Sequence, residues 1–358
     1  MDISLVLTLP LLRFQFKWEE IIFTGIFFII GIVASLVWYS NYKTKSSDAF
    51  SWVHICVFEL WFIPIIFLAC NSQILAYFFA YRSASALEKN LTMVRQKRLP
   101  PEAEDRGLFY VTLYFVSPVG FSYDEESTEE KQDERLKEYA LWIIARFIGL
   151  SALCSGIDTE WISHPDALTY AYVLMIFLGL SLCMDMNSFL LCCCSPHIVP
   201  METFCWPILA TSAVDFWRRW NLLMGMHLNR ICYRPLRAFA IPKWLAAVIT
   251  FLLSGLLHEF FFYCAFLSSP YNKFMIFSPY RFGYFMAFFA YAAAGCSLQQ
   301  LLLYIFPMFR KTPRPIAIVW QLYLVIIWNG CSLFTKPLEE IGFFQEIISI
   351  VPHIKQIN

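Results

Sequence analysis

Residues 244–268 read WLAAVITFLLSGLLHEFFFYCAFLS, an apolar stretch long enough to cross a bilayer as a helix. His258 and Glu259 lie near its middle, with Trp244 at one end and Ser268 at the other. Ionisable side chains at that depth are costly to insert and usually face a protein interior or a water-filled cavity. The stretch therefore predicts a membrane-spanning helix that carries a functional group.

The whole chain has the composition of a membrane protein. Of its 358 residues, 59% are hydrophobic and only 15% are charged, against about 45–50% and about 25% in soluble domains. A soluble fold of this size would leave large apolar patches exposed. Acidic and basic residues both number 27, so the net charge is zero. This balance argues against nucleic acid as a partner, because phosphate backbones attract a basic excess.

Hydrophobic length predicts an all-α, polytopic membrane protein with about seven to nine transmembrane helices. The seven clearest spans are 21–39, 53–80, 139–157, 167–192, 244–268, 276–306 and 315–334. Two shorter segments, 108–122 and 341–351, are ambiguous. The first contains Pro118 and Gly120, and an interfacial or re-entrant position suits it better than a span.

Lysine and arginine predict the orientation, because cytoplasmic loops carry an excess of both. With the N-terminus in the cytoplasm, 20 of the 27 lie on the cytoplasmic side, while Arg146 and Arg281 fall inside spans. The C-terminus then faces the lumen, unless 341–351 also crosses. The mixed-charge run Asp124–Glu138 is predicted to be a solvated loop or a short surface helix.

The 12 cysteines give no zinc signature, because no two CxxC motifs stand at a suitable spacing. We therefore expect no metal. The triplet Cys192-Cys193-Cys194 ends a predicted span. Packing inside the membrane and palmitoylation at its boundary are both consistent with this position.

A second motif, DFWRRWN at 215–221, precedes the long apolar stretch. If it is helical, residues four apart share a face, so Phe216 lies with Trp220, and Trp217 with Asn221. The combination of aromatic and basic residues is typical of an interfacial helix.

The surroundings of this motif leave one residue unexplained. Thr211 and Ser212 precede it and can cap the helix, and Arg234 and Arg237 follow it. Binding of anionic lipid headgroups would explain the arginines and tryptophans. It would not explain Asn221, whose amide needs a hydrogen-bond partner among apolar neighbours or costs about 1–3 kcal/mol.

His258 is open to two interpretations from the residues alone, a helix–helix hydrogen bond or a chemical role. Ser254 lies one helical turn before it. Glu259 points about 100° away from His258 on a helix, so we expect it to bind another group, such as Arg146, Arg281 or an arginine of the upstream motif. Two titratable groups in apolar surroundings favour a functional site.

The motif FWRRWN at 216–221, followed by SGLLHE at 254–259 in a polytopic chain, resembles the membrane-bound O-acyltransferase superfamily. The small wax-synthase-like branch is the most similar. The resemblance is specific mainly over 211–260, including Tyr233-Arg234-Pro235. Plant-type wax synthases commonly read FWGRRW, and the shorter spacing here would turn Asn221 by about 100° along a helix.

The resemblance implies a single membrane-embedded acyltransferase domain over 1–358, with 81–138 as a cytoplasmic or interfacial segment and 211–260 as the catalytic motif region. His258 corresponds to the family's catalytic histidine and Asn221 to its second functional position. The helices would enclose a catalytic tunnel. We expect substrate contacts from Trp217, Arg218, Arg219, Trp220, Arg234, Arg237, Ser254 and Glu259.

The chemistry of ester formation suggests a role for each group. His258 can act as a general base towards the acceptor hydroxyl, and Asn221 can donate to the oxyanion, worth about 3–4 kcal/mol in an apolar site. The arginines can bind the phosphates of acyl-CoA, a co-substrate, so no cofactor is expected. The branch resembled implies a long-chain alcohol as the acceptor and a wax ester as the product, in the endoplasmic reticulum membrane.

Other acceptors and other functions stay open from the sequence. Diacylglycerol, a sterol or a smaller hydroxylated metabolite fits the same chemistry. A transporter or channel could use the same buried groups, although no internal repeat of the kind found in many transporters is visible. A non-catalytic lipid-binding scaffold would tolerate loss of both Asn221 and His258. The oligomeric state is not predicted.

Overall fold

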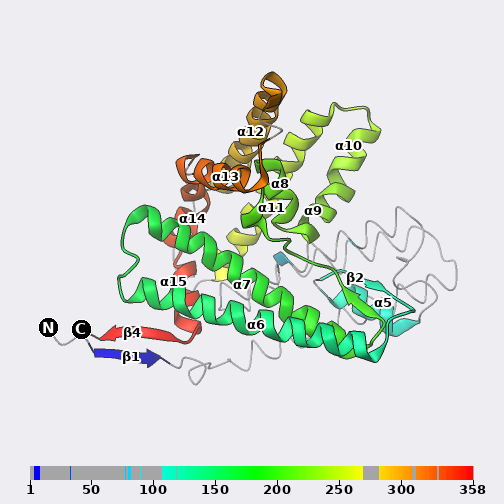
Figure 1. Cartoon of the computed structure of the whole chain (residues 1–358), viewed down its shortest axis with the longest axis vertical. Coiled ribbons are helices and arrows are strands. Elements are labelled where there is room, and N and C mark those ends of the chain that lie inside the picture. The colour runs from blue at the N-terminus through cyan, green and yellow to red at the C-terminus, as the bar shows by residue number, and fades with distance from the viewer. Residues whose placement is uncertain are drawn as a thin grey trace. The chain divides into compact units, whose positions relative to one another are not determined.

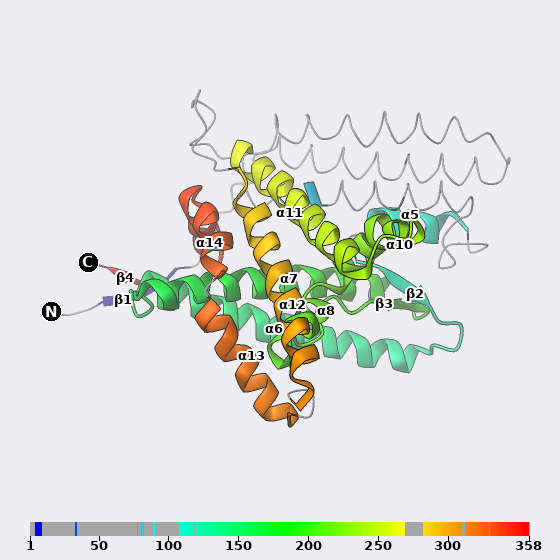
Figure 2. The ribbon, with the colours of Figure 1, turned by 90° about the horizontal axis from the view of Figure 1, so that it is seen from above.

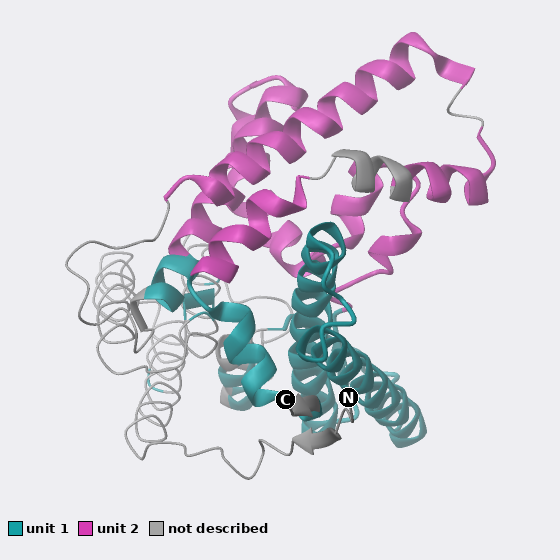
Figure 3. Cartoon of the chain, turned by 90° about the vertical axis from the view of Figure 1, so that its left-hand side faces the viewer, with its two compact units in different colours: residues 1–201, 261–278, 341–358 teal, residues 202–260, 279–340 magenta. Residues whose placement is uncertain are grey.

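The computed structural model describes residues 4–8, 107–117, 119–268, 282–308, 312–328 and 330–357, and the single positions Val33, Tyr77, Ala80, Tyr81 and Lys89 (Figure 1). The chain divides into two compact units (Figure 3). Unit 1 comprises 1–201, 261–278 and 341–358, and unit 2 comprises 202–260 and 279–340. The single domain expected over 1–358 stays a prediction, because two such units can belong to one membrane domain.

The described part of the chain is mostly helical, as its composition predicts. Unit 1 contains β1 (Ser4–Thr8), α5 (Leu108–Val116), β2 (Phe121–Tyr123), α6 (Glu129–Asp158), α7 (Pro165–Cys194), β3 (Ile198–Pro200), α15 (Phe343–Ile350) and β4 (His353–Ile357). Unit 2 contains η3 (Pro207–Leu209), α8 (Ala213–Arg219), α9 (Leu222–Leu228), η4 (Asn229–Tyr233), α10 (Arg234–Ala238), α12 (Tyr284–Ile305), α13 (Arg314–Trp328) and α14 (Cys331–Glu340). Helix α11 (Lys243–Ser268) begins in unit 2 and ends in unit 1.

Four of the described helices, α6, α7, α11 and α12, are long and apolar enough to cross a membrane. They correspond to the predicted spans 139–157, 167–192, 244–268 and 276–306. The predicted spans 21–39 and 53–80 lie almost entirely outside the described residues. The predicted span 315–334 is not one helix, because α13 ends at Trp328 and α14 begins at Cys331.

The two ambiguous segments form short helices. Helix α5 has nine residues and α15 has eight, which gives each about 12–14 Å at 1.5 Å per residue, against a hydrocarbon core of about 30 Å. Neither is long enough to cross as a helix.

The buried Lys89 closes the end of α5, where its ammonium donates to the carbonyl oxygens of Tyr114 (2.6 Å) and Ser117 (2.7 Å). A cation at a helix C-terminus satisfies carbonyls that have no partner within the helix.

Helix α6 contains both a charged run and a predicted span. It starts at Glu129, after Thr128 caps it by accepting the N–H of Lys131, and continues unbroken to Asp158. Its 30 residues extend for about 45 Å, so roughly 15 Å projects beyond the hydrocarbon core. The prediction of a separate loop or surface helix over Asp124–Glu138 is wrong from Glu129 onwards, because these charged residues form the first turns of the long helix itself.

Helices α6 and α7 pack side by side as an antiparallel hairpin (Figures 1 and 2). An ion pair between Arg146 of α6 and Asp185 of α7 joins them. Charged side chains inside a membrane helix are usually paired in this way, because an isolated charge is costly there. The large apolar side chains that α6 leaves exposed, Leu141, Ile144 and Ile148, fit a surface covered by lipid rather than water.

A small sheet lies at the end of the hairpin where α6 begins and α7 ends. Strands β2 and β3 pair antiparallel there, with Phe121 opposite Pro200. From the second turn of α6, the guanidinium of Arg135 donates to the carbonyl oxygen of Pro196 at 2.7 Å. These contacts tie the segments before α6 and after α7 to one another.

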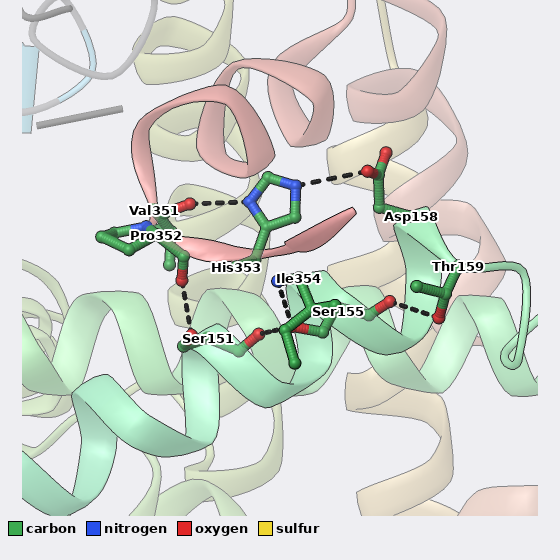
Figure 4. A network of polar contacts seen from close by, with 8 residues as sticks. All are labelled: Ser151, Ser155, Asp158, Thr159, Val351, Pro352, His353 and Ile354. Carbon is green, nitrogen blue, oxygen red and sulfur yellow. Dashed lines mark hydrogen bonds and ion pairs between the residues drawn. The ribbon is translucent and has the colours of Figure 1, made fainter. Parts of the chain in front are cut away.

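Strand β4 docks on the other end of the hairpin (Figure 4). His353 Nε2 lies 3.3 Å from Asp158 Oδ2 at the end of α6, and the N–H of Ile354 donates to Ser155 Oγ at 2.9 Å. Strand β4 also pairs antiparallel with β1, with Thr8 opposite His353. The C-terminal segment is therefore fastened both to α6 and to the N-terminal strand.

The pairing of β1 with β4 brings both ends of the chain together, as the N and C marks in Figure 1 show. A two-stranded sheet leaves backbone groups that hydrocarbon cannot satisfy. The cytoplasmic N-terminus and the side on which the C-terminus lies stay predictions.

Candidate functional site

A reciprocal cap fixes the start of α8, which carries the aromatic and basic motif. Ser212 Oγ accepts the N–H of Asp215 at 3.1 Å, and Asp215 Oδ2 accepts the N–H of Thr211 at 3.0 Å. Such pairs satisfy donors that the first turn of a helix leaves without partners. The predicted cap at Ser212 is confirmed.

Asp215 also holds Arg219, one turn further along α8. Its Oδ1 accepts from Arg219 Nε at 2.9 Å, and the guanidinium also donates to the carbonyl oxygen of Cys205 at 3.3 Å. Burial opposes ionisation of Asp215, but hydrogen bonds from Thr211 and Arg219 outweigh it and hold the pKa of this carboxyl below its usual value. Arg219 therefore braces α8 against the segment before it, and its contact with a substrate stays a prediction.

Asn221 starts a new helix. It is the N-cap of α9, with a φ of −140° and a ψ of 86°, and its Oδ1 accepts the N–H of Met224 at 3.0 Å. The next residue, Leu222, donates its N–H to the carbonyl oxygen of Thr203 at 2.8 Å. The prediction of one helix through the whole motif is wrong, because an N-cap residue has non-helical dihedral angles. The rotation argued from plant-type spacing therefore does not apply, and the cap explains an amide among apolar residues.

The aromatic residues of the motif face two directions. Phe216 and Trp220 stack with ring centres 5.4 Å apart, as their spacing predicts. Trp217 faces the long helices instead, with its ring centre 5.5 Å from that of Phe251 on α11 and 5.7 Å from that of Phe289 on α12. Trp217 is therefore the residue through which the motif reaches α11 and α12.

His258 lies on α11 among aromatic rings. Its ring centre is 4.6 Å from that of Phe289 on α12 and 5.9 Å from that of Phe334 on α14. Its Nδ1 lies 2.7 Å from the carbonyl oxygen of Ser254. Because a carbonyl only accepts, Nδ1 carries the proton and Nε2 carries the lone pair. This tautomer makes Nε2 the nitrogen that can take a proton from another group.

Phe289 connects the two motifs, because its ring contacts both Trp217 and His258. Sequence reasoning missed Phe289 and Phe334. Aromatic residues make up 18% of the chain, so a phenylalanine on a membrane helix gives no signal by itself. These two residues could have been found only by knowing how α12 and α14 pack against α11.

Glu259, the residue after His258, faces the start of α12. It is buried, and its Oε1 accepts the N–H groups of Gly283 (2.8 Å), Phe285 (2.9 Å) and Met286 (3.3 Å). Of the arginines expected as its partners, Arg146 pairs with Asp185, and Arg281 lies outside the described residues. The backbone of α12 supplies three hydrogen bonds to Glu259, and its pairing with an arginine stays a prediction.

Both motifs lie within a segment that matches a known protein family. Residues 135–311 match the family model described as MBOAT, membrane-bound O-acyltransferase family. Residues 135–311 belong to the membrane-bound O-acyltransferase family. The matched residues include both DFWRRWN and SGLLHE, so the family resemblance inferred from these motifs is confirmed.

Several named relatives are similar to this chain over part of the chain's length. A long-chain-alcohol O-fatty-acyltransferase from Simmondsia chinensis is 26% identical over 168 residues, which cover 42% of this chain and 47% of that protein. The probable long-chain-alcohol O-fatty-acyltransferase 6 from Arabidopsis thaliana is 26% identical over 238 residues, which cover 62% and 63%. The acyl-CoA–sterol O-acyltransferase 1 of the same plant is 45% identical over 64 residues, which cover 16% and 19%. The chain thus spans 47% and 63% of the first two relatives, and their names support the wax-synthase-like branch.

The four arginines expected to contact substrate fall into two groups. Arg219 is bound by a carboxylate on its own helix, and Arg237 donates to the carbonyl oxygen of Ile241. Arg218 and Arg234 are exposed. Arg218 and Arg234 are therefore accessible to an anionic ligand, as is the exposed Arg230 between them.

The Tyr-Arg-Pro element of the family resemblance begins at Tyr233, the last residue of a π-helical segment. Helix α9, η4 and α10 run from Leu222 to Ala238 without a break, and η4 is the π-helical part. The ring of Pro235 would clash with the carbonyl four residues earlier in a regular α-helix. A wider turn directly before it accommodates the ring, and such turns are frequent at functional sites.

The cysteine triplet lies at the end of α7, where Cys192 is buried and Cys193 and Cys194 are exposed. Packing inside the protein therefore accounts for the first of the three only. Within the described ranges, no group of three or more His, Cys, Asp or Glu side chains could hold a metal ion.

Proposed function

We propose that this protein transfers a fatty acyl group from CoA to a long-chain alcohol and so forms a wax ester. The observation that carries the proposal is the geometry of His258, whose Nδ1 is bound to the carbonyl of Ser254 on a candidate membrane span. Its Nε2 is then a base in apolar surroundings, as the reaction requires. Family membership supports acyl transfer, and the names of the relatives support the alcohol as acceptor.

The reaction needs one proton transfer in each direction. The hydroxyl oxygen of the alcohol attacks the thioester carbon while Nε2 of His258 takes the hydroxyl proton. The C–S bond then breaks, and His258 returns the proton to the thiolate of CoA. The amide nitrogen of Asn221 donates to the oxyanion, since the amide oxygen already accepts from Met224.

The two ends of acyl-CoA need different surroundings. Arg218 and Arg234 are exposed and suited to its phosphates, and Arg219 and Arg237 support them from within the fold. The thioester must reach a histidine about 15 Å inside the membrane, so we propose a tunnel enclosed by about seven to nine spans. Its lining would include the predicted contacts Trp217, Trp220 and Ser254.

We propose that the protein lies in the endoplasmic reticulum membrane, with the Glu129 and Cys194 end of the hairpin in the cytoplasm. The excess of lysine and arginine in the segments next to that end supports this orientation. The β1–β4 pairing supports a lumenal position for both termini, whereas the loop charges alone suggest a cytoplasmic N-terminus.

A thiol-labelling experiment tests the orientation. A membrane-impermeant maleimide should label the exposed Cys193 and Cys194 in sealed microsomes, and Cys193→Ser/Cys194→Ser is the matched control. Tags placed before Met1 and after Asn358 should both resist protease until detergent is added. Labelling of the pair only after detergent would contradict the proposed orientation, and tags with opposite sensitivities would contradict the shared side of the termini.

The acceptor is tested by supplying each candidate separately. Purified protein in lipid vesicles should convert labelled palmitoyl-CoA and a long-chain alcohol into a wax ester. Faster ester formation with a sterol would favour a sterol acyltransferase, a second candidate supported by the similarity to the sterol enzyme. No ester from an alcohol, a sterol or diacylglycerol would contradict the proposal, and solute transport without ester formation would favour a transporter.

A further inference from the structure

Two neighbouring rows of residues on α11 have different partners. Ser254 and His258, one turn apart, form the row in which the imidazole binds a backbone carbonyl. Gly255 and Glu259, each one position later, form a second row that meets the first turn of α12. The reactive group and the packing contact therefore sit side by side on one helix.

Glu259 caps α12 from another helix. Its side chain is 1% exposed, and one oxygen accepts three N–H groups at the start of α12. Gly283, the N-cap residue, has a φ of 100° and no side chain with which to cap. The first N–H groups of a helix have no partner within it, and an anion at that end is stabilised by the helix dipole. The Glu259 carboxylate supplies what Gly283 lacks.

Gly255 allows α12 to approach α11 closely. A Cβ atom at this position would lie 3.0 Å from Met286 Cα and 3.2 Å from the carbonyl oxygen of Phe285. These are backbone atoms, so only a shift of α12 could relieve the contact. Gly255 and Glu259 together determine where α12 begins relative to His258.

Helix α12 in turn presents aromatic rings to the site. Phe289 contacts both His258 and Trp217, with ring centres 4.6 Å and 5.7 Å away. Phe285 lies 5.1 Å from Phe334, the second ring beside His258. At its other end, Gln299 accepts the N–H of Ala213 at the start of α8. A shift of α12 would therefore move the aromatic wall against which His258 rests.

We infer that Glu259 is a positioning residue for acyl transfer. By capping α12, it holds the aromatic wall that orients His258 and limits the space for the acceptor chain. The inference rests on the proposed function. It gives Glu259 an indirect role through α12, in place of the direct substrate contact expected from the sequence.

Two substitutions at this position separate capping from charge. Glu259→Ala removes the acceptor, whereas Glu259→Gln keeps an oxygen that can accept the same N–H groups. We expect kcat with a long-chain alcohol to fall by about tenfold to a hundredfold in E259A, because small displacements at a reacting group have effects of that size. We also expect a changed ranking of alcohol chain lengths, and recovery of most of both properties in E259Q.

A matched control removes a cap that is remote from the site. Thr128→Ala should lower the thermal stability of α6 without changing the ranking of alcohols. If Glu259 had a purely structural role, E259A would behave like Thr128→Ala. It would give less folded protein, with unchanged KM values and an unchanged ranking of alcohols. Gly255→Ala, which pushes on α12 from the same row one turn earlier, should change the ranking in the same direction as E259A.

Three results would overturn the inference. These are an unchanged kcat and ranking in folded E259A, an E259Q variant as inactive as E259A, and an unchanged ranking in G255A. If E259A does not fold, E259Q and G255A still decide. A parallel His258→Ala variant separates failure of the proposed function from failure of the inference. Full activity in H258A contradicts the proposed function. Loss of activity in H258A together with normal activity and ranking in E259A contradicts the inference alone.

Discussion

Replacing His258 with alanine should lower the rate of ester synthesis by about 10²–10⁴-fold, the usual contribution of a general base. The fold should survive, because the hydrogen bond from Nδ1 goes to the carbonyl of Ser254 within the same helix and does not join separate elements. Removing the imidazole leaves the acceptor hydroxyl without a base beside the thioester. Ester formation from labelled palmitoyl-CoA, normalised to the amount of folded protein, measures the effect.

His227→Ala is a suitable control for the His258 variant. His227 is also a buried histidine of unit 2, on α9, and its replacement should cost stability but leave the rate per folded molecule close to that of the wild type. A His258→Ala protein with full activity would rule out the proposed mechanism. A loss of equal size in both variants would show that the assay reports damage to the fold.

Replacing Asn221 with aspartate should lower kcat by about 10²–10³-fold, as expected for the loss of an oxyanion donor. The substitution separates the two ends of the amide. Aspartate keeps the oxygen that accepts the N–H of Met224, and it caps helices about as well as asparagine. It has no N–H to offer to the oxyanion.

Asn221→Ala removes both ends of the amide. It should lower kcat to a similar degree and also cost about 1 kcal/mol of stability through loss of the α9 cap. Rates and thermal unfolding in detergent distinguish the two variants. If N221D retains the kcat of the wild type while N221A unfolds more readily, the amide serves α9 alone and another group stabilises the oxyanion.

The site could be predicted from the sequence where polar groups interrupt apolar surroundings. His258 is conspicuous because a polar side chain at membrane depth needs a partner or a function, and Asn221 because its amide stands among apolar neighbours. Phe289 and Phe334, which flank His258, could not be found in this way, since apolar rings satisfy the membrane wherever they lie. The neighbours of His258 depend on which turns of α12 and α14 pack beside α11.

The aromatic and basic motif shows the limit of periodicity. Its spacing correctly predicts the stacking of Phe216 on Trp220, because both lie within α8. It wrongly predicts a helix through Asn221, where the chain leaves helical geometry and Leu222 bonds to the carbonyl of Thr203. That hydrogen bond joins residues 19 positions apart, beyond the reach of a local pattern.

Sequence alone determined that the chain is embedded in a membrane, where its four described spans lie, and which histidine interrupts them. These features follow from transfer free energies that each segment carries by itself. Tertiary structure decided that Glu259 caps α12 and that Arg146 pairs with Asp185. It also decided that β1 joins β4. Each of these is a choice of partner for a polar group, and such a choice depends on which distant segment comes within hydrogen-bonding distance.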